Sequence, residues 1–284
     1  MQSLKKTVDI RVKYYVPSSD LRDIVKYYWI VKVEETCNDK KMAKISPTGF
    51  PELIFHFGDT VSINTCEGKV ADKQSECIIA GQITQPVIVI MKSYLNCLCV
   101  KLHPWSLSIL FGIKSTEFVN QAVCIDNVMP QAKRLIHEQL SCTANDMEKI
   151  SIVEGYLRCI VKKNNYHVDP LTAKVISFIQ QGNNNLISGL SNDFHISSRT
   201  LQRRFNDNVG ISAKMLSRIV RFNKAYHLIQ HQPCLNMQDI CFNLGYYDLP
   251  HMIKEFVEFS GVSPLQYFKN ENPYSKLFIN HSNV

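Results

Sequence analysis

One pattern occurs twice in the last third of the chain. Phe205-Asn-Asp-Asn-Val-Gly-Ile-Ser212 recurs as Phe256-Val-Glu-Phe-Ser-Gly-Val-Ser263, and each copy follows a short helix-turn-helix pattern. A long helical segment separates the two copies. A small unit duplicated within one domain can contact a periodic object twice, and double-stranded DNA is the obvious periodic object. The repeat therefore predicts an all-helical domain and indicates double-stranded DNA as its partner.

Capping residues predict where the helices of this region begin and end. Asp169 followed by Pro170 opens one helix, and Gly182 ends it. Ile187, Leu190 and Phe194 mark a second, short helix. Further N-caps are predicted at Ser197, Ser212, Asn236 and Asp248.

The helix that begins at Ser212 extends to about His231, so it has roughly 20 residues and a length of about 30 Å. This length is close to the roughly 34 Å of one DNA turn. A rigid connector of this kind can place two recognition helices in successive major grooves on one face of the duplex.

The helix after Ser197 carries four hydrogen-bonding side chains at positions i, i+3, i+4 and i+7: Arg199, Gln202, Arg203 and Asn206. This spacing places them on one face, opposite Leu201 and Phe205. Guanidinium and carboxamide groups suit guanine O6/N7 and adenine N6/N7 in the major groove. We therefore predict that these four residues contact bases, with an ordinary solvated helix face as the alternative.

Positive charge is concentrated in the same region. The segment from Leu186 to Lys224 contains seven Lys and Arg residues and two Asp residues, which gives a net charge of +5. The net charge of the whole chain is +7. Such a cluster is typical of a surface that binds a polyanion. Five residues are predicted to contact DNA phosphates: Ser197, Arg204, Lys214, Arg218 and Arg221. For the last three, an exposed structural face is the alternative.

The second recognition helix differs chemically from the first. Its exposed face offers Leu249, Pro250, His251, Ile253 and Lys254 as base contacts, beside Glu258. From Ala225 onward three Lys face five acidic residues, a net charge of −2. We expect weaker binding here, with apolar contacts to thymine methyl groups.

Short strand-like runs separated by turn residues occupy the first half of the chain: Glu52–Phe57, Ile78–Ala80, Val87–Met91 and Leu95–Leu102. Helices are predicted at Leu21–Trp29 and after Pro104, and two more helices close this domain. The predicted class is α+β. The expected parts are a β-rich domain (1–128), a helical pair that is also a candidate dimerisation element (129–163), a linker (164–170), a domain of two helix-turn-helix units (171–270) and a tail (271–284).

Neither export nor metal binding is expected. The N-terminus has no apolar stretch typical of a signal peptide, and no run approaches the roughly 20 apolar residues that span a bilayer. The ten cysteines include no Cys-x-x-Cys pair, and Cys97-x-Cys99 lies in an apolar run. We expect a cytoplasmic protein without membrane contact, metal or cofactor, whose cysteines are reduced and mostly buried, with a sensor thiol as the alternative.

Several separated motifs resemble the AraC/XylS family of bacterial transcription regulators. They are Leu190-Ser-Asn-Asp-Phe-His-Ile-Ser-Ser-Arg-Thr-Leu-Gln-Arg-Arg-Phe205, Gly210-Ile-Ser212, Arg221-Phe-Asn-Lys-Ala225, Ile240-Cys-Phe-Asn-Leu-Gly-Tyr-Tyr-Asp248, His251, Glu255-Phe256 and Gly261-Val-Ser-Pro264. The resemblance implies base contacts at the positions of Arg199, Gln202, Arg203, Leu249, Pro250, Ile253 and Lys254. Ser191 and Cys241 stand where the family usually has Ala, and Met252 replaces a usual Phe.

The first domain resembles an uncharacterised N-terminal domain found on some AraC-type regulators. The similarity lies in Tyr14-Tyr-Val-Pro-Ser-Ser-Asp-Leu-Arg22, Tyr27-Tyr-Trp29, Pro51-Glu-Leu-Ile-Phe-His-Phe-Gly-Asp59 and Ala80-Gly-Gln82, and it implies a cupin-like barrel. On a strand, Glu52 and His56 share one face and could line the lumen. Together with Trp105 they form the candidate effector site. The alternative is that Glu52 and His56 are structural hydrogen-bond partners.

The sequence therefore predicts a DNA-binding transcriptional regulator that responds to an unknown small-molecule effector. A homodimer is expected, and RNA polymerase is a candidate partner. One alternative is a regulator whose first domain only dimerises or binds another protein. Another is an alkyl-transfer DNA-repair enzyme, but that chemistry needs a zinc-bound cysteine cluster, and Cys37, Cys66, Cys77, Cys97 and Cys99 do not form two close pairs.

Overall fold

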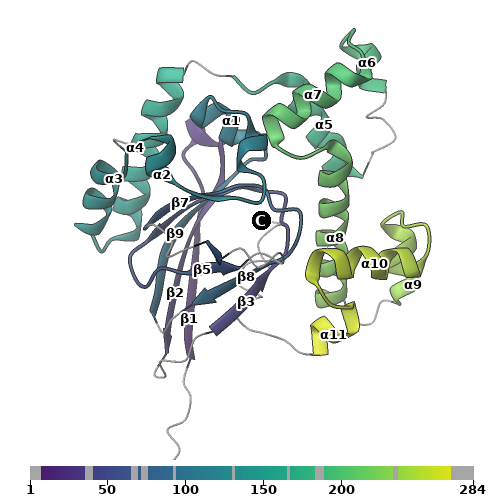
Figure 1. Cartoon of the computed structure of the whole chain (residues 1–284), viewed down its shortest axis with the longest axis horizontal. Coiled ribbons are helices and arrows are strands. Elements are labelled where there is room, and N and C mark those ends of the chain that lie inside the picture. The colour runs from purple at the N-terminus through teal and green to yellow at the C-terminus, as the bar shows by residue number, and fades with distance from the viewer. Residues whose placement is uncertain are drawn as a thin grey trace, which may run out of the picture.

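The computed structural model describes residues 8–35, 41–64, 70–71, 76–91, 94–129, 132–164, 167–182, 189–232 and 236–269. They form a β-rich N-terminal domain with a helical layer and, beside it, an all-helical C-terminal domain (Figure 1). The predicted α+β class is confirmed. None of the helices in these ranges is both long enough and apolar enough to cross a bilayer.

Two antiparallel sheets build the N-terminal domain. The six-stranded sheet has, in spatial order, β1 (Val8–Tyr15), β2 (Val25–Glu35), β9 (Tyr94–Leu102), β4 (Glu52–His56), β7 (Cys77–Ala80) and β10 (Ala122–Cys124). The four-stranded sheet has β3 (Lys41–Ile45), β8 (Val87–Met91), β5 (Ser62–Asn64) and β6 (Val70–Ala71). The four strand-like runs predicted from the sequence correspond to β4, β7, β8 and β9.

The strand register gives the six-stranded sheet two buried faces. Glu52 pairs with Lys101, and Ile54 pairs with Cys99, so these four side chains project from the same face. That face meets the four-stranded sheet, with Trp29 among the buried residues between the two sheets. The opposite face packs against helices.

The helix predicted at Leu21–Trp29 is wrong. A 3-10 turn, η1 (Ser19–Leu21), is followed by strand β2, whose side chains point alternately to the second sheet and to the helical layer. Tyr28 is buried on one side and Trp29 on the other. A strand buried on both faces gives a continuous apolar run, which periodicity alone does not distinguish from a helix.

Helices cover the outer face of the six-stranded sheet. They are α1 (Ser106–Phe111), η2 (Ser115–Phe118), α2 (Ile125–Val128), α3 (Ala132–Ser141) and α4 (Asp146–Asn164). At the start of α4, Asp146 accepts hydrogen bonds from Lys13 Nζ at 2.8 Å and from Tyr15 Oη at 3.0 Å. Further along, Arg158 Nε donates to Asp20 at 2.6 Å. The predicted helical pair is thus anchored to the sheet as part of the N-terminal domain.

The C-terminal domain contains α5 (Pro170–Gln181), α6 (Leu190–Asp193), α7 (Ser198–Val209), α8 (Ala213–His231), α9 (Met237–Asn243), α10 (Leu249–Ser260) and α11 (Pro264–Lys269). Side chains of all five predicted N-caps accept backbone hydrogen bonds: Asp169, Ser197, Ser212, Asn236 and Asp248. Helices α6 and α7 form the first helix-turn-helix unit, and α9 and α10 form the second. The predicted Ile187 and the tail (271–284) lie outside the described residues.

The two domains contact each other along α7 and α8. Ser115 Oγ of η2 donates to the Asn208 carbonyl oxygen at 2.6 Å, and Lys114 Nζ lies 3.2 Å from Asp207 Oδ2. Asn223 of α8 donates through Nδ2 to the carbonyl oxygens of Pro47 and Thr48, at 3.2 and 3.4 Å. Two helices of the C-terminal domain, α7 and α8, are therefore hydrogen-bonded to the N-terminal domain.

Candidate DNA-recognition helices and ligand cavity

The first recognition helix, α7, exposes three of the four predicted base-contacting residues. Arg199, Gln202 and Arg203 are solvent-exposed, while Leu201 and Phe205 on the opposite face are buried. The structure places Asn206 differently from the prediction. It is partly buried, with a buried Oδ1, because this end of α7 contacts α1 and η2 of the N-terminal domain. The exposed recognition face is therefore Arg199, Gln202 and Arg203.

Two predicted phosphate contacts on α7 also have local structural roles. Ser197 Oγ accepts the Thr200 backbone N–H at 3.1 Å and so caps the helix. Arg204 forms an ion pair with Asp169, the N-cap of α5. Lys214, at the start of α8, is exposed. Contact of these residues with phosphates stays a prediction.

Arg218 and Arg221 do not lie on an open side of α8, as the sequence had suggested. Both guanidinium groups face α10, where Glu255 Oε2 lies 2.9 Å from Arg218 Nε and 2.8 Å from Arg221 Nη2. Arg218 also reaches Glu258 at 2.6 Å. The Glu255 side chain is only 1% exposed. These pairs join the connector helix to the second recognition helix.

The electrostatics of this cluster keep Glu255 ionised. Burial acts to raise the pKa of Glu255, but the hydrogen bonds from Arg221 and Arg218 outweigh it, so the pKa lies below its ordinary value. Arg221 also lies 4.1 Å from the centroid of the Tyr246 ring, and Arg218 lies 5.0 Å from that of Phe259. Both cations are therefore committed to contacts within the protein.

The second recognition helix, α10, presents Pro250, His251 and Lys254 to solvent. Leu249 and Ile253 are partly buried, so their apolar side chains remain partly accessible for contact with DNA. Tyr247, directly before the Asp248 cap, is 92% exposed and was not among the predicted base contacts.

The connector α8 separates the two recognition helices (Figure 1). It has 19 residues, so its length is about 28 Å at the usual helical rise. This agrees with the predicted connector, and it is close to the roughly 34 Å repeat of the duplex.

A cavity of about 310 Å³ lies between the two sheets of the N-terminal domain. Its wall is mostly apolar and comes from β2, β4, β7 and β9 on one side and from β5 and β8 on the other. Loop residues 46, 48 and 50 and residues 120–122 line one end. This is the size of a small-molecule site.

Two of the three predicted effector-site residues line this cavity. Glu52 accepts a hydrogen bond from Lys101 Nζ through Oε1. His56 is 2% exposed, and burial lowers its pKa because the charged imidazolium is disfavoured there.

The third predicted residue, Trp105, is wrongly assigned. It precedes α1 on the helical side of the sheet and does not line the cavity. Its Nε1 donates to the Asp23 carbonyl oxygen at 2.8 Å, and its ring stacks on His103.

The cysteines occupy both buried and exposed positions. Cys77, Cys97, Cys99 and Cys241 are buried, whereas Cys142 and Cys159 are exposed. Burial raises the pKa of the Cys97 and Cys99 thiols. Within the described ranges, no group of three or more His, Cys, Asp and Glu side chains is arranged to hold a metal ion. Cys37 and Cys66 lie outside those ranges.

Comparison with known families agrees with the duplicated helical unit. Residues 190–270 match the family described as "Helix-turn-helix domain", and residues 13–124 match a "Domain of unknown function (DUF6597)". Among curated proteins, none matches the chain. The C-terminal part is an AraC-type helix-turn-helix domain, as the sequence motifs had implied.

Comparison with solved structures finds matches at low sequence identity. ToxT from Vibrio cholerae is 10% identical, with 92% of this chain and 98% of that chain covered and a TM-score of 0.45. ToxT bound to (E)-4-(8-methylnaphthalen-1-yl)but-3-enoic acid is 11% identical, with 92% and 98% covered and a TM-score of 0.46. The C-terminal domain of AraT, a response regulator from Geobacillus stearothermophilus, is 23% identical, with 38% and 93% covered and a TM-score of 0.33. At these TM-scores the superpositions are loose, and the assignment rests on the family match.

Proposed function

We propose that this chain is a sequence-specific transcriptional regulator whose AraC-type domain binds DNA in response to a small molecule held in the N-terminal cavity. Helices α7 and α10 would enter successive major grooves, with α8 as the spacer between them. Arg199, Gln202 and Arg203 would contact bases, and Lys214 would contact a phosphate. Such a protein would act in the cytoplasm, where it meets the chromosome.

The ligand response is supported by one loop of the N-terminal domain that lines the cavity and also contacts α8 of the C-terminal domain. Ser46, Thr48 and Phe50 line the cavity. The carbonyl oxygens of Pro47 and Thr48, in the same loop, accept hydrogen bonds from Asn223 of α8. A ligand that shifts this loop would therefore change a contact made by the connector between the recognition helices.

A second connection runs from the same end of the cavity to α7. Gly81 lines the cavity, and a Cβ atom at this position would lie 1.8 Å from the Phe118 carbonyl oxygen, so only glycine allows this approach. Phe118 ends η2, whose Ser115 bonds to α7. Helices α7 and α8 are thus both connected to the cavity wall.

DNA binding can be tested by incubating the full chain with random or genomic fragments and sequencing those that bind. We expect an operator with two half-sites whose centres lie about 10 base pairs apart. Arg203→Ala should relax discrimination at one base position and cost about 1–3 kcal/mol. Arg11→Ala, which removes an exposed arginine of β1, is the control. Absence of any enriched sequence with the wild-type chain would reject the proposed function.

The link between cavity and DNA can be tested without a known ligand. Val87→Phe places a larger side chain in the cavity wall, whereas Met42→Phe changes a residue of the same sheet that is 61% exposed. Allosteric couplings typically change affinity about 5–150-fold, so Val87→Phe should change operator affinity several-fold and Met42→Phe should not. Equal affinities for both folded variants would reject the coupling.

A homodimer formed through α3 and α4 and a contact with RNA polymerase stay predictions. A light-scattering mass measurement of the purified chain would test the first. Pull-down of purified polymerase in the presence of operator DNA would test the second.

A further inference from the structure

One charged pair interrupts the apolar wall of the cavity. Glu52 of β4 accepts a hydrogen bond from Lys101 of β9 through Oε1. Glu52 belongs to the cavity wall, whereas the Lys101 side chain beside it is only 4% exposed and does not line the cavity. The carboxylate is therefore the charged group that a bound molecule would meet first.

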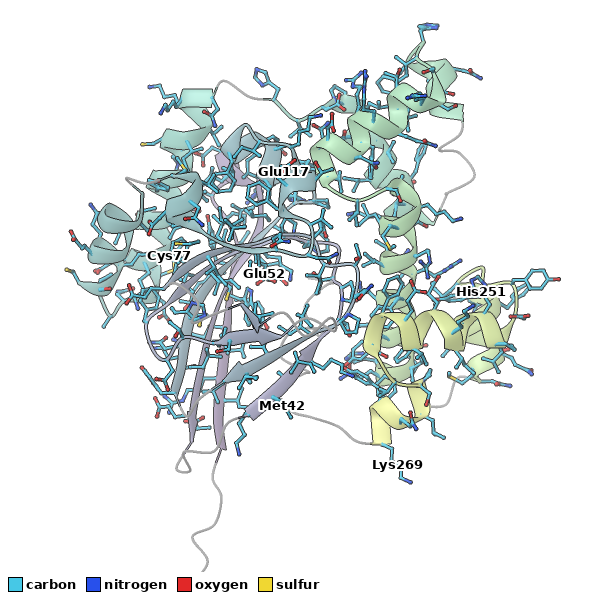
Figure 2. All side chains as sticks on the ribbon, viewed as in Figure 1. Met42, Glu52, Cys77, Glu117, His251 and Lys269 are labelled. Atoms are coloured by element: carbon cyan, nitrogen blue, oxygen red, sulfur yellow. The ribbon has the colours of Figure 1, made fainter. Side chains whose placement is uncertain are left out.

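The second carboxylate oxygen of Glu52 is available to a ligand. Among the described residues, the only side-chain hydrogen bond of Glu52 is the one to Lys101, and 14% of the Glu52 side chain remains exposed. Glu52 projects from the six-stranded sheet on the side away from α3 and α4, toward the space between the sheets (Figure 2). Its neighbours on the wall include Ile54 and Ala80, whose side chains offer no donor.

An accessible carboxylate oxygen in an apolar enclosure has a clear chemical preference. Leaving an acceptor without a donor in such surroundings costs free energy, and a charged acceptor costs more than a neutral one. A ligand ammonium or hydroxyl group that donates to this oxygen would remove that cost, and charge-assisted hydrogen bonds are the stronger kind. A ligand carboxylate would instead face a like charge, because Lys101 is already paired.

We propose that the cavity binds an apolar molecule that carries an amine or hydroxyl group, and that this group donates a hydrogen bond to Glu52 Oε2. The inference rests on the proposed function in one respect, since it assigns a ligand class to the cavity that regulates DNA binding. Glu52 is the residue that determines specificity.

A second cation near this end of the cavity defines the competing interpretation. Lys26 Nζ lies 4.5 Å from the centroid of the Phe50 ring, and Phe50 lines the cavity. Burial and the neighbouring Lys101 lower the pKa of Lys26 to about 8. If Lys26 rather than Glu52 governed recognition, acidic ligands would bind better than basic ones.

The test compares three probes that share one apolar body: 4-phenylbutylamine, 4-phenylbutan-1-ol and 4-phenylbutyrate. Their dissociation constants are measured on the full-length chain by ligand-observed NMR or calorimetry at pH 7. We expect the amine to bind at least tenfold more tightly than the acid, with the alcohol between them. Tighter binding of the acid, or no binding of any probe at millimolar concentration, would overturn the proposal.

Two variants identify the group responsible. Glu52→Gln leaves Lys101 without its counter-ion, so the preference should invert and the acid should bind more tightly than the amine. Because the unpaired lysine could prevent folding, the double variant Glu52→Gln/Lys101→Met removes both charges, and it should bind amine and acid within about threefold of each other. A tenfold amine preference retained in the double variant would show that Glu52 is not the acceptor.

DNA binding of the same samples separates the two hypotheses. Wild-type protein that binds its operator but lacks the amine preference would refute the ligand class alone. Protein that shows the amine preference but binds no DNA sequence selectively would refute the proposed function and leave the ligand class standing.

Discussion

Replacing Glu255 by Gln should strongly destabilise the C-terminal domain. Its carboxylate accepts hydrogen bonds from Arg218 at 2.9 Å and from Arg221 at 2.8 and 3.1 Å. A glutamine of the same size keeps one acceptor oxygen and turns an NH2 group toward a guanidinium. At least one of the three hydrogen bonds is therefore lost, and the cluster loses its buried negative charge, while Arg218 keeps its ion pair with Glu258.

The exposure of the side chains in this cluster determines how much unfolding free energy should be lost. Removing one partner of a fully buried ion pair costs about 3–5 kcal/mol. Here Arg218 and Arg221 keep 25% and 22% of their side-chain surface exposed, so water can partly hydrate them. We therefore expect Glu255→Gln to lower the free energy of unfolding by about 2–3 kcal/mol, below the fully buried case. Glu258→Gln is the matched control, because Glu258 is 42% exposed and, within the described ranges, forms an ion pair with Arg218 only. Its cost should be at most about 1 kcal/mol.

Urea unfolding can resolve the affected domain. The chain has two tryptophans: Trp29 is buried between the two sheets, whereas Trp105 also packs against the core of the C-terminal domain. Both variants are therefore measured in a Trp105→Phe background, in which fluorescence reports on the N-terminal domain. Circular dichroism at 222 nm is weighted toward the helical C-terminal domain. In Glu255→Gln the dichroism midpoint should fall well below that of Glu258→Gln, with a smaller shift in fluorescence. Equal midpoints for the two variants would refute the idea that Glu255 organises the contact between α8 and α10.

Four other outcomes are expected. Lys214→Gln should lower the salt slope of DNA binding by about one unit, whereas Arg218→Gln should mainly lower stability; the reverse pattern in a salt titration would argue against the assignment. The loss of unfolding free energy caused by Glu255→Gln should stay constant from neutral pH down to about 5 and become smaller below about 4.3. The reason is that a carboxyl group with a depressed pKa stabilises the fold only while it is ionised. Unfolding curves of both proteins at several pH values measure this. Gly210→Ala should cost more than Gly182→Ala in thermal unfolding: both glycines have positive φ, but only at Gly210 would the new Cβ meet the N-terminal domain, 2.7 Å from a carbonyl oxygen. In an operator scan, mismatches under α7 should cost about 1–3 kcal/mol each and those under α10 less; equal costs would contradict the difference between the two helices.

Local signals predicted the C-terminal domain well. A cap such as Ser197 or Asp248 acts within three residues, so the sequence alone contains the complete interaction. The exposure of Arg199 and Arg203 follows in the same way, because helical periodicity places them opposite a buried Leu201.

Predictions failed where a partner lies far away in the sequence. Arg221 meets Glu255 across 34 residues, and Glu52 meets Lys101 across 49. Asn206 is partly buried because its helix contacts another domain, which no periodicity within the helix reveals. Trp105 was assigned to the wrong side of the sheet because strand order was unknown. These outcomes depend on tertiary contacts, which short-range patterns do not encode.

Several positive charges of the first helix-turn-helix unit and of the connector α8 are paired with acidic side chains in the folded protein. The seven cations counted in the first unit include Arg204, which is paired with Asp169, and Arg218 and Arg221, which are paired with Glu255. The long-range field of the domain is therefore weaker than the sequence count suggests, because paired charges largely cancel beyond a few ångströms. Arg199 and Arg203 stay exposed on α7, and no ion pair joins them to the described residues. Phosphate attraction and base recognition would then come from the same short helix, which also contacts the N-terminal domain through Ser115. A ligand that displaced this one helix would thus affect both contributions to DNA binding together.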